Sequence, residues 1–126
     1  MKKIKTIVER THTGYSAYAE KYPVATVGSS LEELKKNILE ALNLYFEKED
    51  KIITETNLEI TLDLPQFFKF YKVINAKALS ERIGINQSLL AQYIKGNKQP
   101  SPTQTRRILT GVQQVGKELA AIRFLL

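Results

Sequence analysis

The chain has 126 residues, contains no cysteine and carries a net charge of +6 at pH 7. The lack of cysteine excludes disulfide bonds, thiol catalysis and cysteine-ligated zinc. A hydrophobic content of 43% is enough for a packed core and too high for a disordered chain. No apolar stretch approaches the ~20 residues of a membrane-spanning helix, and charged residues interrupt the N-terminal segment where a signal peptide would be apolar. We therefore expect a cytoplasmic protein that does not enter a membrane.

The positive charge is concentrated in the C-terminal half. Residues 1–55 contain nine Lys or Arg and nine Asp or Glu, whereas residues 56–126 contain ten and four, a net charge of +6. A basic half beside a neutral half predicts that one half meets a polyanion and the other has a different role.

The first 63 residues have the pattern of a small α+β domain with the order β-β-β-α-β. Alternating apolar residues predict strands at residues 4–10, 15–20, 24–27 and 58–62, with a turn before the second strand. Ser30 and Glu33 predict a reciprocal capping box, in which the hydroxyl accepts from the Glu33 amide and the carboxylate reaches back. Apolar residues from Leu31 to Tyr45 then repeat every three or four positions, which predicts a helix that packs on the sheet.

The carboxylates that could serve catalysis are scattered: the chain's two aspartates, Asp50 and Asp63, lie near the ends of predicted elements, and Glu9, Glu20 and Glu59 fall singly on predicted strands. An RNase H-like nuclease needs clustered carboxylates that hold two metal ions. The one histidine, His12, falls in a predicted turn without evident partners. We therefore expect no catalytic site, no metal and no cofactor.

The C-terminal half is predicted to be all-α. Pro65 starts a short helix rich in aromatic residues, which we interpret as a core element, although aromatics beside lysines can also stack on single-stranded bases. Asn75 predicts the cap of a helix over residues 76–83, and Gly84 can take the left-handed conformation where that helix stops. Asn86 caps a second predicted helix over residues 87–95. This layout is typical of a helix-turn-helix.

Residues 79–101 resemble the Cro/repressor (XRE-type) helix-turn-helix family. The matching pattern is a small residue at Ser80, Gly84 four positions later, an aliphatic residue, a polar cap, Gln-Ser, and a closing Gly-Asn-Lys-Gln-Pro-Ser. The main departure is Ser80, where alanine is commoner and similar in volume. The resemblance implies that the second helix enters the major groove of DNA. The residues implied to read bases are Gln87, Ser88 and Gln92, and those implied to meet phosphates are Asn86, Lys95, Asn97 and Lys98.

A different use of this polar helix is also open, because a degenerate domain could use the same face for protein contacts. Apolar residues near the C-terminus repeat at intervals of 4-3-4-3-4: Ile108, Val112, Val115, Leu119, Ile122 and Leu126. This heptad spacing predicts either a dimer interface over the first five of them or internal packing against the aromatic helix. Gly111 and Gly116 could break the helix.

The N-terminal half resembles the HicB-type antitoxins, which use a reduced RNase H-like fold. The matching features are the lysine-rich first strand, the Gly14-Tyr15 turn, the Gly-Ser-Ser-Leu-Glu-Glu-Leu segment at residues 28–34, and a helix ending Ala-Leu-Asn-Leu-Tyr at residues 41–45. The chain departs between residues 18 and 27, where family members carry an Asp and a Pro-Gly-Cys segment.

Together the two resemblances imply an antitoxin of a type II toxin–antitoxin system. Residues 1–63 would bind and mask a small HicA-type RNA-cleaving toxin, while residues 64–126 would bind operator DNA as a homodimer or higher homo-oligomer and repress the shared operon. One alternative is a stand-alone dimeric repressor whose N-terminal domain oligomerises or senses a ligand. The other is a nucleic-acid-processing enzyme with an RNase H-like site, against which the scattered carboxylates argue.

Overall fold

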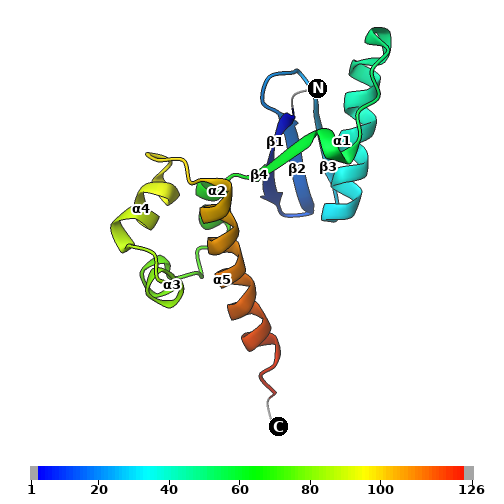
Figure 1. Cartoon of the computed structure of the whole chain (residues 1–126). Helices are drawn as coiled ribbons and strands as arrows, with labels where there is room; N and C mark the ends of the chain where they lie inside the picture. The colour runs from blue at the N-terminus through cyan, green and yellow to red at the C-terminus, as the bar shows by residue number, and fades with distance from the viewer. Residues whose placement is uncertain (1–2, 124–126) are drawn as a thin grey trace. The chain divides into compact units, whose positions relative to one another are not determined.

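A computed structural model describes residues 3–123 and divides the chain into two compact units, Met1–Phe70 (unit 1) and Tyr71–Leu126 (unit 2). The fold is mixed α+β, as the sequence predicts (Figure 1). The elements of unit 1 are, in chain order, β1 (Ile4–Thr11), β2 (Gly14–Ala19), β3 (Ala25–Gly28), α1 (Leu31–Tyr45), two 3-10 turns (Glu47–Glu49 and Glu55–Asn57), β4 (Leu58–Leu62) and α2 (Leu64–Phe70). Those of unit 2 are α3 (Ala76–Ile83), α4 (Gln87–Lys95) and α5 (Pro102–Ala120).

The four strands of unit 1 form one sheet in the order β3-β2-β1-β4. β1 pairs antiparallel with β2 and parallel with β4, and α1 lies in the chain between β3 and β4. A parallel pair needs such a crossover because a tight hairpin can join only antiparallel strands. The predicted order β-β-β-α-β is therefore confirmed.

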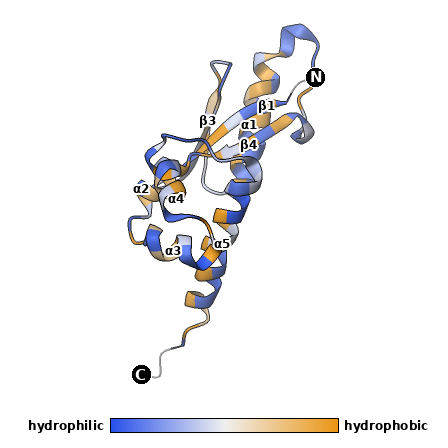
Figure 2. Cartoon of the chain, turned by 60° about the vertical axis from the view of Figure 1, so that its left-hand side comes forward, coloured by the Kyte–Doolittle hydropathy of each residue, from blue (hydrophilic) through white to orange (hydrophobic). Residues whose placement is uncertain are grey.

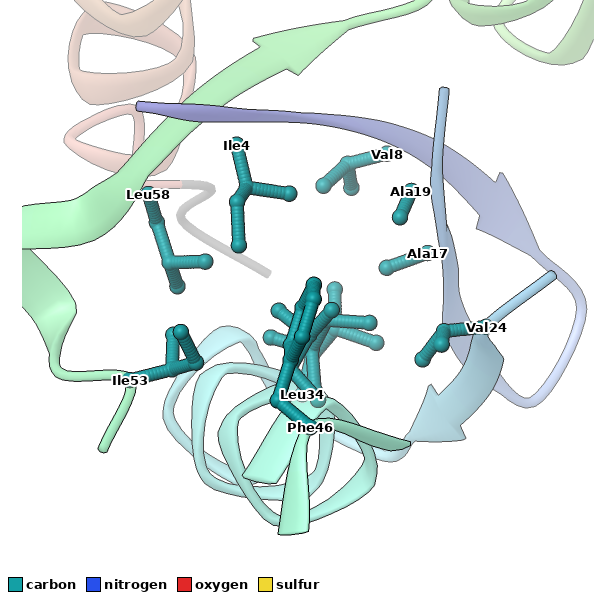
Figure 3. Packing of buried hydrophobic residues seen from close by; sticks show 11 residues of the cluster. Ile4, Val8, Ala17, Ala19, Val24, Leu34, Phe46, Ile53 and Leu58 are labelled. Carbon is teal, nitrogen blue, oxygen red and sulfur yellow. The ribbon is translucent and has the colours of Figure 1, made fainter. Parts of the chain in front are cut away.

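The core of unit 1 lies between the sheet and α1 (Figure 3). The buried side chains at its centre come from alternate positions of β1 and β2 and from every fourth position of α1: Ile4, Val8, Ala17, Ala19, Leu34, Ile38 and Leu42. The two ends of the predicted helical stripe, Leu31 and Tyr45, are exposed, as is Ile60 on the edge strand β4. Figure 2 shows hydrophobic and hydrophilic residues alternating along α1, as expected for a helix with one buried side.

The N-terminus of α1 uses half of the predicted capping box. The Ser30 hydroxyl accepts a 3.1 Å hydrogen bond from the Glu33 amide. The Glu33 carboxylate, however, accepts a 2.6 Å bond from the hydroxyl of Ser29. Hydrogen bonds from the side chain and the backbone of Ser29 lower the pKa of Glu33 and favour its charged form at the positive end of the helix.

Helix α2 belongs to unit 1, whereas the sequence placed residues 64–70 with the helical half. The Gln66 side chain accepts a 2.9 Å bond from the Arg10 amide and donates a 2.7 Å bond to the Arg10 carbonyl. Gln66 thereby provides hydrogen-bond partners for the backbone of Arg10, which lies beyond Val8, the last β1 residue that pairs with β4. Phe68 is buried, and the Phe70 ring lies 5.3 Å from that of His12. The boundary between the units therefore falls after Phe70.

The core of unit 2 is built from five buried apolar side chains of α3, α4, α5 and the turn between α3 and α4: Leu79, Ile85, Leu90, Tyr93 and Ile108. Ser80 is buried too, and its hydroxyl donates a 2.6 Å bond to the Lys77 carbonyl. Helix α5 continues through both glycines that could have broken it. At Gly111 a Cβ would overlap Cγ2 of Ile83, so this glycine lets α5 approach α3 closely.

Within residues 3–123, no helix combines the length and the apolar character needed to cross a bilayer.

Candidate nucleic-acid interface

Helix α4 is bounded by local signals that fix which side chains it presents. The Asn86 side-chain oxygen accepts bonds from the amides of Ser88 (2.9 Å) and Leu89 (3.3 Å), which satisfies two free donors of the first turn. Gly84 before the helix and Gly96 after it have φ values of 72° and 80°, where a side chain would be strained. The sequence predicts the Asn86 cap and the helix end at Gly84 correctly.

Polar side chains occupy one side of α4. Gln87, Ser88 and Lys95 are exposed and Gln92 is half-buried, whereas Leu90 and Tyr93 are buried. At about 100° per residue, the four polar positions fall within about 140° of the helix circumference, opposite the buried pair. We call Gln87, Ser88, Gln92 and Lys95 the polar stripe of α4.

The loop after α4 extends this surface. Asn97 and Lys98 are exposed, and their amides donate to the Gln92 carbonyl at 2.9 and 3.3 Å. These bonds fold the loop back against the C-terminal end of the helix. The result places Lys95, Asn97 and Lys98 at one end of the stripe and Gln87 and Ser88 at the other.

Asn86 is only partly available for the predicted phosphate contact. Its oxygen is used by the cap, which leaves the side-chain N–H group as the donor to a ligand. The structure thus gives this residue a role in helix formation as well as a place beside the stripe.

The electrostatic character of unit 2 is strongly positive. Residues 71–126 contain nine Lys or Arg and two Asp or Glu, a net charge of +7, while residues 1–70 contain ten and eleven, a net charge of −1. One of the two acids, Glu118, forms an ion pair with Arg82, and this bond lowers the pKa of Glu118. Lys95 and Lys98 take part in no ion pair among residues 3–123, so their charges remain available to an anion.

A second arginine stabilises the turn that positions α4. The Arg107 guanidinium of α5 donates to the carbonyls of Ile83 (2.8 Å) and Gly84 (3.1 Å) at the C-terminus of α3. A cation at this end of a helix also interacts favourably with its dipole. No local sequence pattern predicts this contact, because residues 24 and 23 positions apart meet only in the folded unit.

The predicted dimer interface on α5 needs two corrections. Ile108 is 0% exposed and belongs to the chain's own core, so it cannot contact a second chain. Ile122 lies beyond the helix, which ends at Ala120, and Leu126 is outside the described residues. Val112 and Val115 are half-buried, and Leu119 is 62% exposed. The apolar surface open to a partner is therefore shorter than the heptad spacing predicts.

Unit 1 brings together two carboxylates that are far apart in the sequence. The parallel pairing of Val8 with Leu62 places Glu9 of β1 beside Asp63, which directly follows β4. Burial, followed by the hydrogen bond and the charge of Asp63, raises the pKa of Glu9. In the described part of the chain, no three His, Cys, Asp or Glu side chains are grouped so that they could hold a metal ion.

Comparison of the chain with protein-family models, with curated proteins and with solved structures finds no match in any of the three.

Proposed function

We propose that this chain is a DNA-binding regulator, with α3 and α4 acting as a helix-turn-helix of the Cro/repressor type. The observation that carries the proposal is the polar stripe of α4 in a unit with a net charge of +7. Nucleic acid is the polyanion whose recognition calls for both features, because phosphates attract the charge and base edges need side chains that donate and accept.

The length of the stripe fits this role. At about 1.5 Å per residue, Gln87 and Lys95 are separated by about 12 Å along the helix axis, and the major groove is about 12 Å wide. Gln87 and Ser88 would meet base edges, as the N-terminal residues of a recognition helix do. Lys95, Asn97 and Lys98 would then contact the phosphate backbone.

The finer proposal is that the chain is an antitoxin. Unit 1 would hold a small HicA-type RNA-cleaving toxin while unit 2 represses the shared operon as a dimer. The different charges of the two units, −1 and +7, support separate roles for them. The resemblance of unit 1 to HicB-type antitoxins supplies the identity of the partner.

The first experiment measures binding of the full chain to DNA from upstream of its own gene, over a range of salt concentrations. Gln87→Ala and Gln92→Ala should each lose about 1–3 kcal/mol of preference for operator over random DNA. Gln113→Ala, an exposed glutamine on α5, is the matched control and should change nothing. Full operator preference in both stripe variants would contradict the assignment of α4.

The phosphate contacts have their own readout in the same assay. Lys95→Ala and Lys98→Ala should weaken binding to all sequences alike and each reduce the salt slope by about one unit. Lys117→Ala removes the same charge near the far end of α5 and should leave the slope closer to its original value. Binding that does not respond to salt would refute a phosphate-contacting surface.

The antitoxin role is tested separately. The chain is co-expressed with the neighbouring open reading frame, and both growth rescue and co-purification are measured. Rescue together with a stable complex supports the antitoxin. Operator binding without either result leaves the stand-alone repressor as the better assignment.

A further inference from the structure

The outer edge of β4 has unpaired backbone groups. The Asp63 amide donates to the Val8 carbonyl at 2.9 Å, so residue 63 points its backbone groups toward β1. Because these directions alternate along a strand, Leu58, Ile60 and Leu62 point theirs away from the sheet. The Leu58 amide is used by the Glu55 carbonyl. The outward groups that remain are the Leu58 carbonyl and the amides and carbonyls of Ile60 and Leu62. None of them has a hydrogen-bond partner in the described part of the chain.

The other edge of the sheet is blocked at one position. On β3 the Val27 carbonyl accepts a 2.7 Å bond from the Asn37 side chain of α1. Unpaired strand edges are sites where another strand can add, and proteins commonly block those that are not used. Unit 1 therefore blocks an acceptor on β3 and leaves β4 open.

The sequence of β4 is complementary to itself. In an antiparallel pair of two β4 strands centred on Ile60, Ile60 lies opposite the other Ile60, Leu58 opposite Leu62, and Glu59 opposite Thr61. The free groups would form about four hydrogen bonds, two between the Ile60 residues and two from a Leu62 amide to a Leu58 carbonyl. Ile60 is 43% exposed and would be covered by its counterpart, and no like charges face each other.

From this complementarity we infer that the β4 edge binds a second copy of this chain and joins the two sheets into one. The contact uses no residue of the polar stripe of α4 or of the apolar surface of α5. A five-residue strand gives a small interface, so association through it depends on protein concentration. If α5 also pairs, the chain has two different two-fold interfaces, which form a closed tetramer where their axes meet at right angles.

Cysteine cross-linking in the full chain tests the register, because the native sequence has no cysteine. Glu59 and Thr61 would form a non-hydrogen-bonded pair, with Cα atoms about 4.5 Å apart, within the usual range for a disulfide of about 4.4–6.8 Å. Mixing Glu59→Cys chains with Thr61→Cys chains under mild oxidation should give a covalent heterodimer at several times the yield of homodimer from either variant alone. A mixture that cross-links no better than the separate variants would overturn the inference.

Two further variants control for accidental cross-linking. Val27→Cys places a thiol at a 66% exposed position of the other edge strand and should give only background homodimer. Adding Ile60→Lys to both partner chains places two lysines opposite each other and should reduce the heterodimer to background. An unchanged yield in this background would also overturn the inference. Ile60→Lys alters an exposed side chain, and its circular dichroism spectrum confirms that the chain still folds.

Discussion

Two glycines of α5 provide a direct test of how this helix packs. Gly111 and Gly116 both lie in the helix, so replacing either with alanine gains the same intrinsic helix propensity, about 1 kcal/mol. Their surroundings differ. A Cβ at Gly111 would overlap Cγ2 of Ile83 and lie 3.7 Å from Cδ1 of Leu79, whereas a Cβ at Gly116 would meet nothing within 4 Å.

The expected changes in unfolding free energy follow from these contacts. Gly116→Ala should stabilise the protein by up to about 1 kcal/mol. Gly111→Ala gains the same term but forces Ile83 or the helix to move, and overpacking of this kind costs about 1–3 kcal/mol. The variant should therefore be destabilised by up to about 2 kcal/mol, and the difference between the two variants measures the packing cost alone.

The assay is urea unfolding followed by circular dichroism, with equal slopes required before midpoints are compared. Ile83→Ala removes the methyl group that the new Cβ would overlap. In the Gly111→Ala background it should therefore cost less than it does alone, and a double-mutant cycle measures this coupling. If Gly111→Ala stabilises as much as Gly116→Ala, α5 does not approach α3 at this position and the reasoning is wrong.

Two further predictions concern single side chains. Asn86→Ala should lose the α4 cap and about 0.5–2 kcal/mol of stability. Asn86→Asp should keep the cap and the stability but weaken DNA binding. If the unmodified protein and both variants unfold at the same urea concentration, Asn86 does not cap α4. The raised pKa of Glu9 means that the folded state holds this proton more tightly than the unfolded state, so its contribution to stability falls as pH rises through the raised pKa. Glu9→Gln should therefore stabilise the protein near neutral pH and lose this advantage at about pH 4. The urea midpoints of the variant and the unmodified protein, measured at both pH values, test this. If the difference between the two midpoints is the same at both pH values, repulsion from Asp63 is excluded.

Local sequence signals predict much of the fold. Alternation of apolar residues gives the strands, a repeat of three or four gives α1, and the caps at Ser30 and Asn86 give the starts of two helices. These features depend on residues close in the chain, so they can be recognised without knowledge of tertiary contacts. The polar stripe of α4 follows from the same local information, because a helix with defined ends has defined faces.

The features that the sequence analysis missed depend on contacts between distant residues. The pairing of Glu9 with Asp63 needs the parallel register of β1 and β4, which no local pattern encodes. Intrinsic propensity left a break at Gly111 open, whereas close packing against Ile83 explains this glycine within a continuous helix. Heptad spacing placed Ile108 on an apolar face of α5 but could not show whether that face packs within the chain's own core or against a second chain.

The hydrogen bonds between Gln66 and Arg10 decide where this protein can be cut. An expression fragment that stops after residue 63 would leave the Arg10 amide and carbonyl without these partners. It would also remove the buried side chains of Leu64 and Phe68. Loss of solubility in such a fragment would reflect a misplaced end, whatever the function of the remaining residues. Separate study of the two units should therefore begin with fragments divided after Phe70.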